Sequence, residues 1–432
     1  MTLAEVFDRL TGGGTGMEFR AYDGSRAGPH DAPVRVEIRS LRALRYLVQA
    51  GKDLGLARAY VSGELEVHGD LHRALSELLR ATNGHVPLRE RLRVLRHAGL
   101  GALRPIAAPP QEARARGPRH SKRRDADAVS HHYDISNRFY RWLLGPSMAY
   151  TCAVYPDRGS TLEEAQFAKF DLVCRKLGLR PGMRLLDVGC GWGGMVLHAV
   201  RHYGVEALGV TLSREQVEWA QRTIADAGLA DRAEVRLLDY RDVPETGFDA
   251  ISSIGLTEHV GKAELASYFA VLYTKLQPAG RLLNHCITHH DNEQPKLLRN
   301  GFMDRYVFPD YELLAPGHII SAMHDAGFEL RHEENLREHY ARTLAAWADN
   351  LEEHWADAVG EVGMGRARTW RLYLAGSRVS FDEDFIELHQ VLGSKTESGR
   401  AAMPLRPDWE GAPRVLLSPG EEAGHPGEIP SP

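Results

Sequence analysis

One stretch of the sequence, residues 184–200 (RLLDVGCGWGGMVLHAV), limits the possible folds more than any other. It joins a buried apolar strand, a glycine-rich turn and the start of a helix without a break. Further apolar runs alternate with helical segments from about residue 126 to 400, among them EALGVTL, AEVRLLD, FDAISSIGL and GRLLNHCI. This alternation predicts an α/β domain built on a parallel, doubly wound, Rossmann-like sheet.

A smaller α+β domain is expected to precede this one. Residues 1–105 mix short strand-like runs such as VRVEIR with helical stretches such as SLRALRYLVQA. Residues 106–125 are rich in proline, glycine and basic side chains and predict a linker, after which the large domain occupies residues 126–400. Residues 411–432, in which proline, glycine and glutamate dominate, predict a disordered tail.

Composition excludes several classes of protein. With 43% hydrophobic and 26% charged residues, the chain is expected to be soluble and globular. Its four cysteines show no CxxC spacing, so neither a metal site nor a disulfide framework is expected. The acidic N-terminal sequence is unlike a signal peptide, and no apolar run reaches the roughly 18 to 20 residues that span a bilayer. These features favour the cytoplasm.

The glycine turn indicates a nucleotide-type cofactor. Closely spaced glycines at a helix start suit a dinucleotide pyrophosphate as well as S-adenosylmethionine. Three features favour S-adenosylmethionine: Asp187 before the first glycine, the spacing G-x-G-x-G, and a second strand that contains the start of GVTLSREQ. Asp187 can receive the amino group of that cofactor, the segment from Thr211 to Gln216 lies where the ribose and adenine would rest, and Asp239 ends the next strand near the adenine.

Residues 130–157 are dense in aromatic side chains, and two readings of them stay open. The first is a helix that packs on the sheet, and the second is an aromatic wall that faces a substrate. The aromatic residues concerned are Tyr133, Phe139, Tyr140, Trp142, Tyr150 and Tyr155.

Taken together, the motifs resemble one family. LLDVGCGWGG, GVTLSREQ, GLTEHVG, LLNHCIT, YVFP and YARTLAAW, in this order, are similar to the cyclopropane-fatty-acid synthase family. That family includes mycolic acid cyclopropane synthases and fatty-acid methyltransferases that make mid-chain branches. The resemblance implies a methyltransferase that uses S-adenosylmethionine and acts, through a carbocation, on the cis double bond of an unsaturated acyl chain in a phospholipid.

The resemblance also implies the residues of the site. A bound bicarbonate would serve as the base, and no metal would take part. The bicarbonate ligands would be Cys152, Glu258, His285 and Tyr340. The cofactor would be bound by Tyr150 and Thr151 at the methionine end, by Tyr240 and Arg241 at the adenine edge, and by Asp187, Gly189, Gly191, Gly193, Thr211, Leu212, Ser213, Gln216 and Asp239.

One departure from the family pattern concerns the product. Ser377 stands in YLAGS, where the family commonly carries a cysteine, so a thiolate role at this catalytic position is excluded. This difference and the late sequence MPLRPDW favour a methylene or methyl branch over a cyclopropane ring. A methyl product would require a separate reductase as partner. A homodimer, a small-molecule O- or N-methyltransferase and a non-catalytic lipid- and cofactor-binding protein remain alternatives.

Charge is distributed unevenly along the chain. Residues 89–124 hold eleven Arg or Lys against two acids, a local charge of +9 that leaves −14 elsewhere. This basic segment, together with an accessory N-terminal domain associated with lipid, predicts peripheral contact with anionic phospholipids at the inner face of the membrane. Nucleic acid is not expected as a partner, because no nucleic-acid-binding motif accompanies the basic segment.

Overall fold

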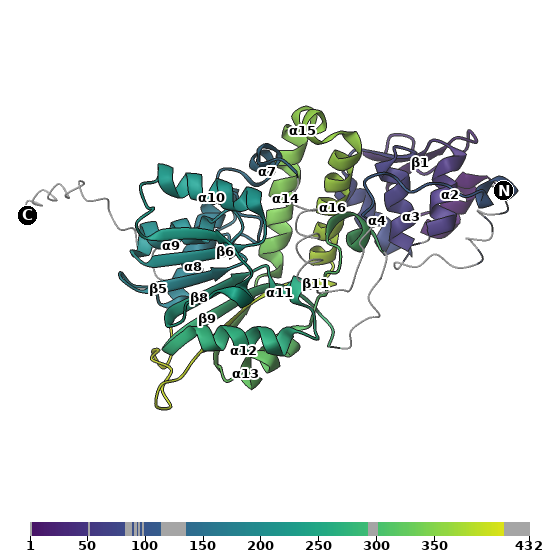
Figure 1. Cartoon of the computed structure of the whole chain (residues 1–432). Helices are drawn as coiled ribbons and strands as arrows, with labels where there is room; N and C mark the ends of the chain where they lie inside the picture. The colour runs from purple at the N-terminus through teal and green to yellow at the C-terminus, as the bar shows by residue number, and fades with distance from the viewer. Residues whose placement is uncertain are drawn as a thin grey trace, which may run out of the picture.

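The computed structural model describes residues 2–50, 52–82, 89, 93, 96, 99–113, 135–292 and 301–409. Two β-sheets lie at opposite ends of the molecule, and a layer of helices separates them (Figure 1). The sheet near the N-terminus has four strands and the other has seven.

The seven-stranded sheet has the order β10-β11-β9-β8-β5-β6-β7. Its five strands from β7 to β9 run parallel, as the sequence predicts, whereas β11 pairs antiparallel with both β9 and β10. The expected purely parallel sheet is therefore mixed. The strands are β5 (Arg184–Val188), β6 (Glu206–Thr211), β7 (Ala233–Leu237), β8 (Phe248–Ile254), β9 (Leu276–His289), β10 (Glu329–Asn335) and β11 (Ile386–Ser394).

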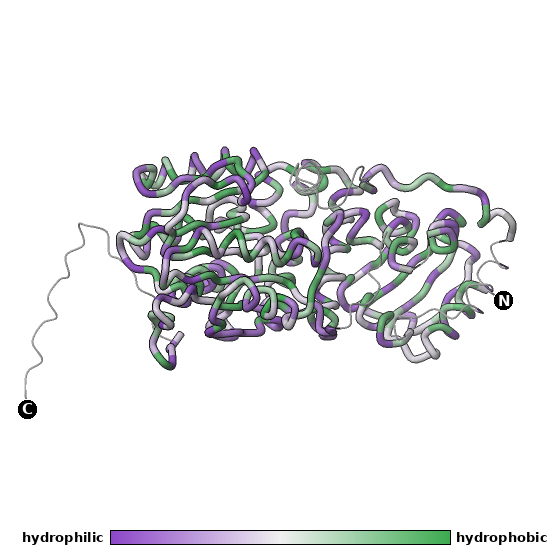
Figure 2. Tube along the Cα trace, turned by 60° about the horizontal axis from the view of Figure 1, so that its bottom comes forward, coloured by the Kyte–Doolittle hydropathy of each residue, from purple (hydrophilic) through white to green (hydrophobic). Residues whose placement is uncertain are grey.

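Helices cover both faces of this sheet and enclose a separate apolar core on each side. One face carries α8 (Leu162–Leu177), α9 (Gly194–Tyr203) and α10 (Arg214–Asp226), and the other carries α12 (Leu265–Lys275) and α13 (Pro316–Asp325). Figure 2 shows hydrophobic residues gathered along the inner strands, while the outer helices alternate between hydrophilic and hydrophobic residues. The arrangement confirms the doubly wound α/β class.

Local sequence signals set the helix ends. The α8 helix begins with a capping box, in which Thr161 and Glu164 each accept a hydrogen bond from the other's backbone N–H. It ends at Gly178, whose φ of 69° lies in the left-handed region that favours glycine. Such pairs of start and stop signals explain why the alternation of elements is readable from the sequence.

The N-terminal sheet has the order β2-β1-β3-β4 and packs against three helices, and a fourth helix packs on one of these, which agrees with the expected α+β character. Its strands are β1 (Met17–Ala21), β2 (Arg26–Ala27), β3 (Val34–Ile38) and β4 (Leu65–His68). The helices are α1 (Leu3–Thr11), α2 (Leu41–Ala50), α3 (Lys52–Val61) and α4 (Leu71–Thr82), and the short η1 (Leu100–Leu103) follows.

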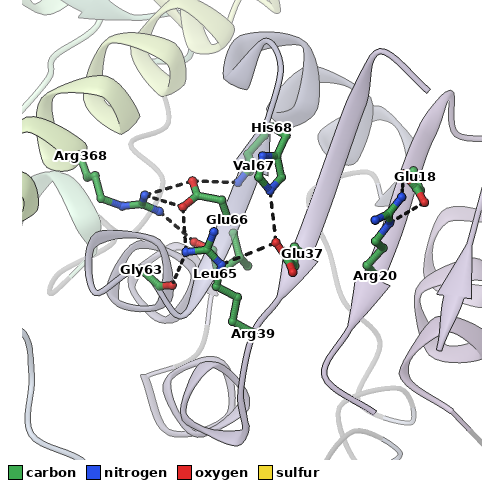
Figure 3. A network of polar contacts seen from close by, with 10 residues as sticks. All are labelled: Glu18, Arg20, Glu37, Arg39, Gly63, Leu65, Glu66, Val67, His68 and Arg368. Carbon is green, nitrogen blue, oxygen red and sulfur yellow. Dashed lines mark hydrogen bonds and ion pairs between the residues drawn. The ribbon is translucent and has the colours of Figure 1, made fainter. Parts of the chain in front are cut away.

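The helical layer between the sheets consists of α7 (Asn137–Leu144), α14 (Arg337–Glu353), α15 (Trp355–Val362) and α16 (Met364–Asp382) (Figure 1). A single apolar core joins α14 and α16 to the N-terminal helices and strands. At this junction the buried Arg368 of α16 donates to the carboxylate of Glu66 and to the carbonyl of Leu65 (Figure 3). It also donates to the carbonyl of Tyr60. The domain boundaries given above remain a prediction.

The described part of the expected linker makes specific contacts. Glu112 is only 7% exposed, and its carboxylate accepts hydrogen bonds from Arg58 of α3 and from Arg305 of η3 (Met303–Val307). Residues 114–125, most of the basic stretch at 87–100, Tyr133 and the tail at 411–432 lie outside the described residues. Within the described ranges, no helix is long and apolar enough to cross a membrane.

Candidate active site

The glycine turn at the carboxyl end of β5 has the geometry that the sequence predicts. Gly189, Gly191 and Gly193 have φ values of 73°, 53° and 82°, and Gly193 caps the start of α9. These angles strain any residue with a Cβ. A Cβ added to Gly191 would meet no atom within 4 Å, because this glycine faces open space.

A cavity lies beside this turn. Eight of the predicted cofactor residues line it: Gly189, Gly191, Thr211, Leu212, Gln216, Asp239, Tyr240 and Arg241. Sequence reasoning missed His259, Val260, Pro309 and Asp310, which also line it. The motifs GLTEHVG and YVFP, noted only for the family resemblance, were the signal that could have identified them.

The remaining predicted cofactor residues do not line the cavity: Tyr150, Thr151, Asp187, Gly193 and Ser213. Ser213 caps α10 and accepts a hydrogen bond from the Gln216 N–H at 3.3 Å. The Thr211 hydroxyl donates to the side-chain carbonyl of Gln216 at 2.6 Å, which holds that side chain at the cavity. Ser213 therefore supports the loop that presents Thr211 and Gln216.

Asp239 and Arg241 form one unit at the other end of the cavity. The Asp239 carboxylate accepts hydrogen bonds from the Arg241 backbone N–H at 2.9 Å and from its guanidinium at 2.6 and 2.8 Å. The guanidinium also lies 5.4 Å from the ring centroid of Tyr240. Contact of these three residues with an adenine remains a prediction.

Asp187 lies at the end of β5 and is buried. Ser252 of β8 donates to its carboxylate at 2.6 Å. Burial raises the pKa of Asp187 to about 7, although the Ser252 hydrogen bond and the Lys169 charge oppose that rise. Lys169 itself is fully buried, and burial lowers its pKa to about 7. Reception of the cofactor's amino group by Asp187 remains a prediction.

Glu258 lies on the short helix α11 (Thr257–Val260), directly after β8. One carboxylate oxygen accepts the Ile287 backbone N–H of β9 at 2.8 Å, and the other has no hydrogen-bond partner among the described residues. Burial raises the pKa of Glu258 to about 7. A buried carboxylate with one unpaired oxygen is suited to a ligand that donates a hydrogen bond.

His285 of β9 is two residues from Ile287, so both side chains lie on the same face of the strand. Its imidazole contacts the Thr151 hydroxyl at 3.2 Å and the Gln390 side-chain amide at 3.1 Å. Burial holds the pKa of His285 well below its usual range, so the ring is neutral near pH 7. Through this contact Thr151, which is predicted to bind the methionine end of the cofactor, lies beside His285, a predicted catalytic residue of β9.

Cys152 and the backbone of Tyr340 both lie near the Leu336 carbonyl at the start of α14. The Cys152 thiol is buried, donates to the Ala153 carbonyl at 3.1 Å and lies 3.8 Å from the Leu336 carbonyl, which also accepts the Tyr340 N–H. Burial raises the pKa of Cys152, so it stays a thiol. The Tyr340 ring packs 4.6 Å from Phe381, measured between ring centroids.

Aromatic rings from α7, α14 and α16 surround Tyr150. Their centroids lie 5.3 to 6.1 Å from that of Tyr150, and they belong to Tyr140, Trp347 and Trp370. The Tyr150 hydroxyl also donates to Tyr373 at 3.0 Å. Trp347, Trp370 and Tyr373 were missed by sequence reasoning because they are distant in sequence from Tyr150.

The two readings of the aromatic segment apply to different residues. Phe139 and Tyr140 of α7 are buried in the apolar core, and the Trp142 ring stacks on His354 with 5.9 Å between ring centroids. These contacts support the reading of a packed helix. Tyr155 is stacked on His339 at 6.3 Å.

Ser377 is half-buried on α16, one turn beyond Tyr373, and none of the described hydrogen bonds links it to the other four predicted catalytic residues.

The sheet order, the glycine turn and the adjoining cavity define a Rossmann-like methyltransferase that uses S-adenosylmethionine. The model of the family described as mycolic acid cyclopropane synthetase matches residues 120–391. The chain belongs to this family.

Two relatives extend the match over nearly the whole chain. A probable fatty acid methyltransferase of Mycobacterium tuberculosis is 51% identical over 423 residues, which cover 95% of this chain and 99% of the relative. A probable fatty acid methyltransferase of Pseudomonas putida is 40% identical over 88% of this chain and 92% of its own length. The N-terminal region is therefore shared with fatty acid methyltransferases.

Solved structures match the larger domain. The cyclopropane synthase MmaA2 from Mycobacterium tuberculosis has a TM-score of 0.59 and 34% identity, and the match covers 62% of this chain and 98% of that one. The mycolic acid cyclopropane synthase CmaA1, complexed with SAH and CTAB, has a TM-score of 0.59 and 32% identity over 62% of this chain and 97% of its own. These matches confirm the predicted fold class and S-adenosylmethionine as the cofactor.

Proposed function

We propose that the protein transfers the methyl group of S-adenosylmethionine to the cis double bond of an unsaturated fatty acyl chain. The observation that carries this proposal is Glu258, a buried carboxylate with one oxygen that has no partner among the described residues, next in sequence to residues that line the cofactor cavity. The fatty acid methyltransferases among its relatives support the acyl substrate.

The chemistry explains the composition of the site. S-adenosylmethionine supplies the methyl group as an electrophile, and an alkene has no proton to lose before it attacks. The new carbon–carbon bond therefore leaves a positive charge on the neighbouring carbon of the acyl chain. The rings around Tyr150 exclude water from that cation and offer it their electron-rich faces.

A base must then remove a proton, and we propose that bicarbonate acts there. The unpaired oxygen of Glu258 can accept the O–H of a bicarbonate, so the residues fit such a group. Bicarbonate would supply the basic oxygen that receives the proton. His285 and Tyr340, with Cys152 at the start of α14, complete the proposed ligand set.

The carbon that carries the positive charge when the proton leaves determines the product. Proton loss from the added methyl group closes a cyclopropane ring if the charge sits on the neighbouring carbon. After a hydride shift, the same loss gives an exocyclic methylene, which a separate reductase would convert to a methyl branch. Ser377 and the similarity to fatty acid methyltransferases favour the branched product.

Labelled methionine tests the reaction class. Cells that express this protein would be grown with methionine carrying a trideuterated methyl group, and their lipids would be examined by mass spectrometry. Methylation of an alkene retains two of the three deuterium atoms, because one leaves as the proton. Retention of all three would contradict the proposal and favour O- or N-methylation.

The proposed lipid is a phospholipid, reached by the basic segment at the membrane surface. Each basic side chain near an anionic surface contributes about 1 kcal/mol. A quadruple serine variant should therefore sediment less with anionic vesicles, in a salt-dependent way, and still bind S-adenosylmethionine. The positions to change are Arg119, Lys122, Arg123 and Arg124. Equal sedimentation of both proteins at low salt would contradict this membrane contact.

A further inference from the structure

A row of polar side chains crosses three strands of the large sheet behind the proposed site. Glu334 of β10 is paired in register with Gln390 of β11, and Gln390 is paired with His285 of β9. Register partners point to the same face of a sheet, so these three side chains form one line. Lys176 of α8 lies over this line and is fully buried.

Hydrogen bonds connect the row from end to end. The Lys176 ammonium pairs with the Glu334 carboxylate and donates to the side-chain carbonyl of Gln390 at 2.8 Å. The Gln390 amide nitrogen lies 3.1 Å from Nδ1 of His285, and Nε2 of His285 lies 3.2 Å from the hydroxyl oxygen of Thr151.

The charge at one end determines the direction of every bond. The nearby His332 imidazole and the adjacent ammonium lower the pKa of Glu334 to about 2, so Glu334 is an acceptor at neutral pH and Lys176 is the donor. An ammonium has no acceptor, so the Gln390 atom facing it must be the carbonyl oxygen. The NH₂ group of Gln390 then faces His285, and Nδ1 must accept.

We propose that Lys176 and Gln390 are positioning residues that hold His285 neutral with its proton on Nε2. Three charged groups act on this imidazole: Lys169 and Lys176 from α8, and Glu334 from β10. In this tautomer the Nε2–H group of His285 donates to the hydroxyl oxygen of Thr151. The Thr151 hydroxyl can then donate its own hydrogen to another acceptor. The single N–H of His285 is then held by Thr151, so His285 contributes to the proposed bicarbonate site through the threonine hydroxyl and is not the base.

The catalytic meaning of this arrangement rests on the proposed function, but the tautomer can be measured without turnover. The full-length protein would be labelled with ¹⁵N-histidine, and the signals of His285 would be assigned by their loss in His285→Asn. We expect Nδ1 to give a pyridine-type resonance and Nε2 a pyrrole-type resonance. A protonated Nδ1 in the wild-type protein would overturn the proposal.

Variants test the cause of the tautomer. Lys176→Met removes the donor that orients Gln390, so the amide can flip and the second tautomer should appear, whereas Lys176→Arg should restore the wild-type spectrum. Lys395→Met is the matched control, because the Lys395 ammonium is half-buried and also donates hydrogen bonds, but to the carbonyls of Tyr273 and Leu276, away from His285. An unchanged His285 spectrum in folded Lys176→Met would overturn the proposal.

Turnover gives a second readout. Lys176→Met and Gln390→Leu should lower kcat by about tenfold or more and leave the Kd for S-adenosylmethionine within about twofold, as expected when a partner of a catalytic-site ligand is lost. If Lys176→Met does not fold, the wild-type spectrum and Gln390→Leu decide the question. Absence of any lipid methylation by the wild-type protein would contradict the proposed function while leaving the predicted spectrum intact.

Discussion

Replacing Glu258 by glutamine should have opposite effects on turnover and on stability. Glutamine keeps an oxygen that can accept the Ile287 N–H but cannot carry a negative charge. Turnover should fall by about 10²-fold or more, because the proposed base loses its anionic partner. In the wild-type protein, turnover should rise with pH through about 7 as the buried carboxylate ionises.

The stability effect follows from the raised pKa of Glu258, from 4.5 to about 7. Between these values the folded protein binds more protons than the unfolded chain, so wild-type stability falls as pH rises through this window. At about 1.4 kcal/mol per pKa unit, the loss above pH 7 is about 3 kcal/mol. The Glu258→Gln variant does not lose this stability as the pH rises, because the glutamine side chain is neutral at every pH.

Urea unfolding, followed by tryptophan fluorescence at about pH 5 and pH 8, measures this difference. The variant should exceed the free energy of unfolding of the wild-type protein by about 1 kcal/mol at the lower pH, where most of the unfolded chain's Glu258 is already ionised, and by about 3 kcal/mol at the higher pH. The control is Glu218→Gln on the exposed face of α10, where water hydrates the carboxylate in both states. If the variant and the wild-type protein differ equally at both pH values, the burial of a charged Glu258 is refuted.

Three further predictions concern the cofactor, the linker and the base. Gly191→Ala should weaken S-adenosylmethionine binding by at least about tenfold in calorimetry, because the added Cβ would occupy the cavity. Gly182→Ala is the control, because Gly182 has the same left-handed backbone but lies outside the cavity, and this variant should bind S-adenosylmethionine normally. Glu112→Gln should lower the free energy of unfolding in urea by about 2 kcal/mol, since two arginines lose their anionic acceptor; unchanged unfolding would contradict a structural role for the linker. Removing dissolved bicarbonate should reduce turnover, and adding it back should restore turnover. An equal rate with and without bicarbonate would exclude bicarbonate as the base.

The sequence by itself determined the local elements and the cofactor turn. The strand, glycine turn and helix at 184–200 are visible because their periodicities and the glycine requirement at positive φ depend only on neighbouring residues. The same applies to the caps of α8. The motifs were specific enough to identify the family, and eight of the predicted cofactor residues line the cavity.

Only the tertiary structure decided the surroundings of the predicted catalytic residues. His285 and Gln390 are 105 residues apart and meet because β11 inserts antiparallel beside β9, a strand order that no local pattern encodes. Lys176 reads in the sequence as an ordinary charged helix residue, yet α8 buries it against Glu334. Strand order and register depend on contacts between distant segments, so a pattern that repeats every two or 3.6 residues can place a side chain on a face but cannot name its partner across the sheet.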